Sequence, residues 1–388
     1  MDATELPGSR PGSGTGPESR PGPAVSTFGV EEEFQLVDRL TRAPVARAEP
    51  VIEAASPSLG EQVQREFYGC MVEVCTRPAT TRTDLRAQLA ALRATLAEAA
   101  AESRCLLVAS GTAVVPPAEP ISVSDTPRYR RMARRFGACV DGRLGVVCGC
   151  HVHIGTADRA QALFLANRVR PWLPALQALA ANSPFSGGLD SGFASWRVVE
   201  FGRWPTVGPA PVLDAAAYEE TAEALVDSGT LMDRRMIYWF ARPSEHHPTV
   251  EFRVADSNAD LDVTVLVALL LRGLCATFLS AAGTGGPPPA VPAVRLRAAH
   301  RYAARYGSTG LVLDPFSGDE VPVRTLLAAL VAAAAPGLDA AGDLTEVDRL
   351  LAGLRGRGNG AERQRAAFGR TGRLHDVVDG LAELTARA

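Results

Sequence analysis

The chain has 388 residues, of which 46% are hydrophobic and 21% are charged, and its formal net charge is -3. This composition is typical of a globular protein with a large core. The nearly balanced charge gives no general attraction to nucleic acid or to anionic membranes, so we expect neither as a partner. All 40 basic residues are arginine, which excludes any mechanism that needs a lysine of this chain as a Schiff base or Walker A phosphate ligand.

The first 26 residues are rich in Gly, Pro, Ser and Arg and hold no apolar segment of the signal-peptide type. We therefore expect a disordered tail at 1–26, followed by a single catalytic domain at 27–388. The seven cysteines form an odd set spread over a long chain, which favours reduced thiols and a cytoplasmic location.

Taken in chain order, the residue pattern after the tail predicts strands interspersed with long helices. It predicts strands at 28–37 and 68–76, a helix at 83–104, a strand at 146–155, helices at 157–181 and 215–226, a strand at 249–256, and helices at 261–279, 323–334, 345–354 and 361–385. Pro171 and Pro174 are expected to kink or divide the helix at 157–181. The Gly- and Pro-rich stretches 202–211 and 283–292 are expected to be loops.

The longest apolar stretch, at 263–279, carries Arg272 near its middle. It is shorter than the roughly 20 residues that span a bilayer, and a central charge is costly in lipid. We therefore expect a buried helix here.

The four predicted strands share one peculiarity, because apolar residues alternate with residues that carry chemistry. Alternation places successive side chains on opposite faces of a strand. One face of each strand is apolar, and the other faces together hold Glu31, Glu33, Glu73, His151, His153, Glu251 and Arg253. This pattern is typical of an antiparallel sheet that covers a core on one side, with helices packed on that side. The sequence thus predicts an α+β fold with a polar sheet face suited to divalent cations such as magnesium.

Each of these motifs has a simpler explanation when it stands alone. A Glu-x-Glu or Glu-x-Arg strand is commonly a solvated face, and His246 and His247 are explained as residues of a turn. Cys148 and Cys150 resemble zinc ligands, but alternation places them among apolar residues, so buried thiols are the favoured interpretation. The functional interpretation depends on all four predicted strands presenting their carboxylate, imidazole and guanidinium side chains on one common face of the sheet.

The segments that carry this chemistry also resemble a known family, the carboxylate-amine ligases often labelled glutamate-cysteine ligase type 2. The resemblance runs in order from about residue 27 to residue 385. It rests on Gly29-Val-Glu-Glu-Glu-Phe, Met71-Val-Glu-Val, Ser110-Gly-Thr, Arg128-Tyr, Gly149-Cys-His-Val-His-Ile-Gly155, Asn182-Ser-Pro, Arg242-Pro-Ser and Thr249-Val-Glu-Phe-Arg-Val-Ala-Asp. It implies a fold like that of the glutamine synthetase catalytic domain, in which a curved antiparallel sheet lines the active site.

The resemblance implies ATP-dependent amide formation through an acyl phosphate, joining glutamate and cysteine to γ-glutamylcysteine. It implies magnesium ligands at Glu31, Glu33, Glu73, His153 and Glu251, and nucleotide contacts from Glu31, His151 and Arg253. It assigns catalytic roles to Arg253, Arg197 and Glu73, and substrate contacts to Arg128, Tyr129, Thr112 and Arg197. The partners that the resemblance implies are small molecules. Whether the protein forms a homodimer stays open at this stage.

Two alternatives stay open at this stage. One is an ATP-dependent ligase for a different acid and amine, which the departures from the family pattern at Glu32, Ala113 and Cys150 keep in view. The other is a zinc hydrolase built on His151 and His153. In the ligase interpretation, Glu33→Gln or Glu251→Gln should impair the chemistry and leave folding nearly unchanged.

Overall fold

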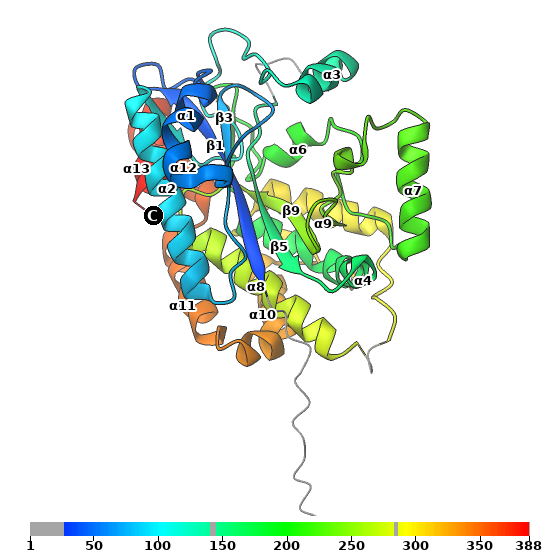
Figure 1. Cartoon of the computed structure of the whole chain (residues 1–388). Helices are drawn as coiled ribbons and strands as arrows, with labels where there is room; N and C mark the ends of the chain where they lie inside the picture. The colour runs from blue at the N-terminus through cyan, green and yellow to red at the C-terminus, as the bar shows by residue number, and fades with distance from the viewer. Residues whose placement is uncertain (1–26, 140–144, 283–285, 388) are drawn as a thin grey trace, which may run out of the picture.

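The computed structural model describes residues 27–139, 145–282 and 286–387. The tail expected at 1–26 lies outside the described residues. A mixed α and β fold, built on an open antiparallel sheet, confirms the predicted fold class (Figure 1).

The main sheet has seven strands. Six follow the order β2-β3-β1-β5-β9-β8, and β4 pairs separately with β1. Their bounds are β1 Phe28–Asp38, β2 Val63–Arg65, β3 Met71–Cys75, β4 Cys105–Val108, β5 Gly149–Gly155, β8 Ala241–Pro243 and β9 Thr249–Asp256. All pairs are antiparallel. Two short hairpins stand apart, β6 Phe185–Ser186 with β7 Leu189–Asp190, and β10 Leu311–Leu313 with β11 Glu320–Pro322.

Thirteen α-helices lie in the described part of the chain. Their bounds are α1 Ala48–Leu59, α2 Arg82–Glu102, α3 Pro127–Arg135, α4 Arg159–Val169, α5 Leu173–Leu179, α6 Arg197–Phe201, α7 Ala215–Asp227, α8 Leu261–Ser280, α9 Ala293–Tyr306, α10 Val323–Ala340, α11 Leu344–Arg357, α12 Gly360–Thr371 and α13 Leu374–Ala386. The apolar faces of β1, β5 and β9 pack with α4, α5 and α8 in the largest core cluster, and α10 packs on α8 (Figure 1). A second cluster joins β1, β3 and β4 to α1, α2 and α13.

Helix α8 is the buried apolar helix that the sequence predicts. By length and composition, α8 and α10 could each cross a membrane, with mean hydropathy of 2.1 and 1.4. However, 78% of the α8 window is buried inside the protein, so packing in the core accounts for its apolar sequence. Its central Arg272 is also buried, where it forms an ion pair with Asp343 and donates to the carbonyl of Thr80 at 2.9 Å.

Several element boundaries differ from the sequence prediction. The strand expected at 68–76 begins only at Met71, because Tyr68 to Cys70 form a turn in which the Met71 N–H donates to the Tyr68 carbonyl at 2.9 Å. The strand expected from residue 146 begins at Gly149. The single helix expected at 361–385 is two helices, because Gly372 adopts the left-handed conformation (φ 69°) that ends α12.

One further prediction about the helices is confirmed, and several helices were not predicted. A 3-10 turn at Arg170–Trp172 divides the helix expected at 157–181, where Pro171 and Pro174 predicted a break. The sequence prediction missed α9, whose short apolar stripe follows a Pro-rich loop, and it missed the shorter helices α1 and α3.

A fully buried ion pair ties the sheet to helix α2. Glu32 lies on the apolar face of β1 and is completely buried, as is Arg93 of α2. Arg93 binds both carboxylate oxygens, at 2.9 and 2.5 Å, and also donates to the carbonyls of Asn258 and Ala259. The departure from the family pattern at Glu32 therefore adds a charge beneath the sheet, and Arg93 neutralises it.

Replacing Arg93 with Met should destabilise the protein by about 3–5 kcal/mol, because it leaves the Glu32 carboxylate buried without a cation. Urea unfolding of both proteins measures the difference. The matched control is Glu49→Gln, which breaks an exposed pair with Arg65 and should cost less than about 1 kcal/mol. Equal effects of the two substitutions would contradict the role given to the buried pair.

Candidate active site

A cavity of about 580 Å3 lies over the polar face of the sheet. The wall combines carboxylates, arginines and imidazoles from β1, β3, β5, β8 and β9 with residues of α3 and α6. Six carboxylates line it, namely Glu31, Glu33, Glu66, Glu73, Glu245 and Glu251, together with five arginines, Arg128, Arg197, Arg235, Arg242 and Arg253. The structure thus brings polar residues of all four predicted strands to one place, although His153 is not part of this wall and lies beside it, in contact with Glu31.

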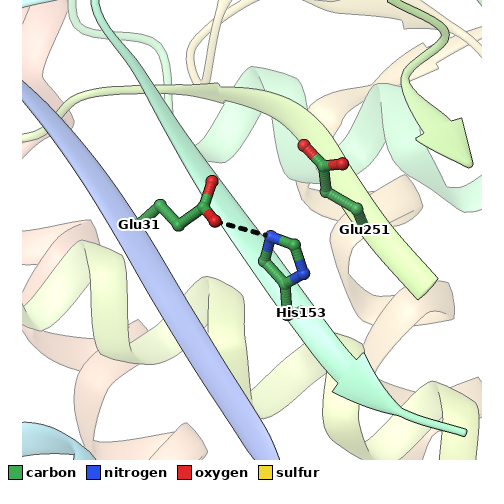
Figure 2. A group of neighbouring side chains, drawn as sticks. All are labelled: Glu31, His153 and Glu251. Carbon is green, nitrogen blue, oxygen red and sulfur yellow. Dashed lines mark ion pairs between the residues drawn. The ribbon is translucent and has the colours of Figure 1, made fainter. Parts of the chain in front are cut away.

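Glu31 lies between the two histidines of β5. Its register partner across the strands is His151, and its two oxygens lie 3.2 Å from His151 Nδ1 and 3.2 Å from His153 Nε2. Figure 2 shows Glu31 and Glu251 on either side of His153, projecting from neighbouring strands. Although burial opposes ionisation, the nearby His153 and His151 imidazoles hold the pKa of Glu31 well below its usual range.

Glu251 of β9 is held between two arginines. Arg242 Nε donates to it at 2.8 Å, and Arg253 also forms an ion pair with it. Burial would raise the pKa of Glu251, but the charges of Arg242 and Arg253 lower it well below the ordinary value. This clamp changes the expectation for Glu251→Gln, because the substitution leaves two guanidinium groups without their carboxylate and should disturb folding as well as chemistry.

Two overlapping groups of side chains have the donor atoms and spacing for a metal ion. One consists of Glu31, His153 and Glu251, and the other of Glu31, Glu73 and His151, with one ligand atom from each residue lying within 4.8 Å of the others. The two histidines fall in different groups, so this geometry does not support a zinc site made by His151-x-His153 acting together. Carboxylates combined with a single imidazole fit a divalent cation.

The electrostatics of the second group favour a bound cation. Burial raises the pKa of Glu73 well above its ordinary value, and the charges of Glu31 and Glu66 add to the rise. Burial and the charge of Glu66 likewise raise the pKa of Glu33 to about 8. Crowded carboxylates of this kind either keep protons or exchange them for a divalent cation.

The pKa values of the two histidines are shifted in opposite directions. Burial and the charge of Arg253 lower the pKa of His151 to about 4, so it is neutral at pH 7 and able to ligate a metal. Burial opposes protonation of His153 too, but the Glu31 carboxylate outweighs it and raises the pKa. His153 Nδ1 lies 2.9 Å from the Thr249 hydroxyl, which fixes the orientation of its ring.

Arg197 reaches the cavity through a gap left by a glycine. A Cβ added at Gly149 would lie 2.2 Å from an Arg197 nitrogen, so only glycine leaves room for the guanidinium there. The backbone N–H of Arg197 donates to the Ser183 hydroxyl at 3.1 Å, and that hydroxyl donates to Asp256 at 2.7 Å. Among the described residues, the guanidinium donates to the Arg253 carbonyl, at 3.4 and 3.5 Å, and its Cζ lies 5.4 Å from the centroid of the Phe201 ring.

Arg128 and Tyr129 of α3 lie in the opposite wall. Arg128 makes two hydrogen bonds to Asp233, at 3.0 and 2.9 Å, so its charge is already paired. The Tyr129 hydroxyl donates to Glu66 at 2.9 Å, and burial raises the pKa of the Glu66 carboxyl. Rings of this wall meet edge to face, with Phe67 and Tyr129 centroids 5.4 Å apart.

Thr112 is not brought to this cavity. Its hydroxyl is buried and donates to the carbonyl of Phe185 at 2.7 Å. The preceding glycine, Gly111, packs against Asp256, whose Cγ would lie 2.7 Å from an added Cβ. The Ser110-Gly-Thr segment thus packs against Asn182, Phe185 and Asp256, and Ala113 is also absent from the cavity wall.

The sequence interpretation missed several residues of the cavity. Glu66 precedes the turn at Tyr68, and Arg242 lies on the short edge strand β8, so neither lies in a long alternating segment. Tyr238 and Trp204 come from loops. His246 and His247, which the sequence analysis explained as residues of a turn, also line the cavity. Cys148 and Cys150 are free and buried, as alternation predicted for thiols in the core.

Comparison with known proteins identifies relatives over almost the whole described chain. The sequence profile of the glutamate-cysteine ligase family 2 matches residues 27–380. A Nocardia farcinica protein provisionally named glutamate–cysteine ligase 2-1 is 44% identical over 365 residues, covering 93% of this chain and 92% of that protein. A Salinispora tropica protein provisionally named glutamate–cysteine ligase 2 is 42% identical over 362 residues, covering 93% and 94%.

Solved structures share the fold at low sequence identity. The glutamate–cysteine ligase of Francisella tularensis, solved in complex with AMP, is similar with a TM-score of 0.73 and 12% identity, covering 93% of this chain and 88% of that one. A bifunctional glutathione synthetase from Pasteurella multocida is similar with a TM-score of 0.68 and 17% identity, covering 93% of this chain and 52% of that one.

Because Glu31 belongs to both groups of metal-type ligands, Glu31→Gln should weaken Mn2+ binding by roughly tenfold or more, or ~1.4 kcal/mol. Electron paramagnetic resonance of free Mn2+ measures the binding, and the rise in Tm with added Mn2+ gives an independent measure. Glu245→Gln is the matched control, because it removes the same charge from the same cavity at a residue that instead bonds Tyr218 and Arg159. A similar loss in both variants would argue against the assigned ligands.

Proposed function

The chain belongs to the glutamate-cysteine ligase family 2, and on that premise we propose that it is an ATP-dependent carboxylate–amine ligase. The γ-carboxylate of glutamate takes the terminal phosphoryl group of ATP and releases ADP. The amine of cysteine then attacks the acyl phosphate, and phosphate leaves as the amide forms. The product is γ-glutamylcysteine.

One observation carries the proposal, namely the charge pattern on the sheet face. Glu31 and Glu251 are held ionised by His153, Arg242 and Arg253, and they are members of the two groups of metal-type ligands, Glu31 of both and Glu251 of one. Phosphoryl transfer needs little from a protein beyond positioning and neutralisation of charge. A face that alternates ionised carboxylates with arginines supplies both.

The candidate ligands fit magnesium. Glu31, Glu73, His151, His153 and Glu251 would hold it, as the two groups indicate, and Glu33 lies beside them. When bound, magnesium would supply neutralisation of the phosphate oxygens of the nucleotide. The AMP complex of the similar Francisella tularensis structure supports a nucleotide as one substrate.

The arginines of the cavity are suited to bind the anionic groups of the substrates. Arg253 lies in β9 beside Glu251, and its charge persists because the surrounding carboxylates raise its pKa further despite burial. We assign it to the transferring phosphoryl group. Arg197 has no carboxylate partner in the described part of the chain, so its guanidinium is suited to a substrate carboxylate. Arg128, paired with Asp233, would have to exchange that partner for a substrate.

A second candidate amine follows from the wall around Glu66. Phe67, Tyr129, Trp204 and Tyr238 place aromatic rings beside this half-buried carboxylate. A carboxylate can pair with an ammonium group, and aromatic faces favour an apolar body or a cation. This wall favours an alternative in which the amine substrate is larger and more apolar than cysteine.

The zinc hydrolase alternative finds no support. The family match is to ligases, and His151 and His153 belong to separate groups of metal-type ligands.

Phosphate release should require ATP, magnesium, an acid and an amine together. A panel that crosses glutamate and other carboxylates with cysteine and apolar amines tests this, scored by release that depends on both partners. EDTA should abolish turnover, and added zinc should not restore it. Turnover that persists in EDTA would refute the ligase proposal, whereas the best pair in the panel decides between cysteine and another amine.

Glu73→Gln should lower turnover about a hundredfold, or ~3 kcal/mol, because it removes a metal-type ligand while keeping the volume. Folding should stay equal or improve, because burial and neighbouring carboxylates make the Glu73 charge unfavourable in the free protein. Phe252→Ala is the opposite control, expected to cost about 2–5 kcal/mol of stability through a cavity beneath β9. Steady-state kinetics and urea unfolding of both variants separate the two effects. Near-normal turnover in Glu73→Gln would remove this residue from the site.

A further inference from the structure

A second cavity, of about 500 Å3, lies among the C-terminal helices. It shares no lining residue with the cavity over the polar face of the sheet, which we call the catalytic cavity after its proposed function. Its walls are the turn between α11 and α12, the body of α12, one side of α13, and the loops at Asn182 and Asn258 to Asp260. Its volume is sufficient for a small metabolite.

Arginine dominates the charge of this cavity. Arg355, Arg357, Arg363 and Arg370 line it, against the carboxylates Asp260 and Glu362. Arg357 and Arg363 are paired with Asp260, at 3.2 and 2.9 Å. Arg355 and Arg370 are exposed and form no ion pair with any residue that the structure describes. Two guanidinium groups are therefore free to bind an anion.

The side-chain oxygen of a buried amide in the wall lacks a hydrogen-bond partner among the described residues. Gln364 is only 2% exposed, and its Nε2 donates to the Asn182 carbonyl at 2.9 Å and to the Asn182 side chain at 2.8 Å. Its Oε1 is buried and accepts no hydrogen bond from the described residues. Both donors of this amide are engaged, so what the site lacks is an N–H or O–H donor.

Two of the four glycines in the wall of this cavity leave open space beside them, whereas an added Cβ at Gly358 or Gly360 would clash with Glu362 or Asn182. A Cβ added at Gly356 or at Gly380 would meet no atom within 4 Å, so packing does not demand glycine at either position. Gly380 lies within helix α13, where glycine is less favourable than other residues. The N-terminus of α12, capped by Asn359, adds a favourable field for negative charge.

We propose that this second cavity binds a small organic anion that carries an N–H or O–H donor near its phosphate or carboxylate group. Arg355 and Arg370 bind the acidic group, and Gln364 Oε1 accepts from the donor. The site is independent of the ligase chemistry proposed above, since none of its residues lines the catalytic cavity.

Isothermal titration of the full chain with two probes tests the proposal. Ribose 5-phosphate offers a phosphate with hydroxyl donors, and N-acetylglutamate offers carboxylates with an amide donor. We expect saturable binding of one of them, and the probe that binds identifies the acidic group. Gly380→Leu should abolish this binding by filling the cavity, and Arg370→Gln should weaken it about tenfold.

Two matched variants separate the site from general effects. Gly369→Leu changes another helical glycine that faces open space, and Arg373→Gln removes another exposed arginine, both outside the cavity wall. Both controls should bind like the wild type. If thermal melting shows that Gly380→Leu does not fold, Arg370→Gln against Arg373→Gln decides. The proposal is overturned if neither probe binds at millimolar concentration, or if binding survives Gly380→Leu or Arg370→Gln unchanged.

Discussion

The antiparallel register of β1, β5 and β9 is the constraint on which the catalytic cavity depends. Glu31 pairs with His151 across β1 and β5, and His153 pairs with Glu251 across β5 and β9. Because side chains alternate between faces, a slip of one residue in either pairing would turn the imidazoles into the core and the apolar residues into the cavity. The buried apolar residues on the reverse face, such as Val152 and Phe252, resist that slip. Core packing thereby determines the positions of the side chains that line this cavity.

The same face separates its carboxylates into two electrostatic sets. Glu31 and Glu251 have lowered pKa values because imidazoles and guanidinium groups neutralise them, whereas burial raises the pKa of Glu33, Glu66 and Glu73. The first set offers a cation ionised ligands without prior loss of protons. Ligands from the second set must release a proton as a cation binds, which makes cation binding at that end of the cavity sensitive to pH. We therefore expect cation binding by the two overlapping groups of ligands to depend differently on pH, even though Glu31 belongs to both.

The period-2 pattern was sufficient to predict four of the seven strands of the main sheet, β1, β3, β5 and β9, together with their buried face and the side chains of their polar face, but it missed β2, β4 and β8. It could not find Glu66 or Arg242, because these residues lie on or beside short strands without enough alternation to carry a signal. Thr112 shows the opposite failure, since its motif suggested a substrate loop while the tertiary contact with Phe185 buries its hydroxyl. Helix boundaries failed for local reasons, as at Gly372, where one left-handed residue divides a continuous helical pattern. Alternation in the sequence therefore predicts regular strands, but it carries no information about contacts between distant loops.

The use of arginine alone as the basic side chain has a structural consequence that helps to assign roles. A guanidinium group does not lose its proton in proteins, so each buried arginine needs acceptors around it. Arg93 and Arg272 find carboxylates in the core, Arg242 and Arg253 share Glu251, and Arg170 donates to the carbonyl of Ala210. Arg197 differs from all of these.

Arg197 is buried to the same degree, yet it forms no ion pair with a described carboxylate, and its guanidinium donates to the Arg253 carbonyl at 3.4 and 3.5 Å and lies over the Phe201 ring. Its backbone is meanwhile fixed by Ser183, and Gly149 keeps its path open. A buried cation held in place with unused donors is costly unless an anion arrives to take them. Of the buried arginines in this cavity, Arg197 is therefore the one whose donors we expect a substrate carboxylate to engage.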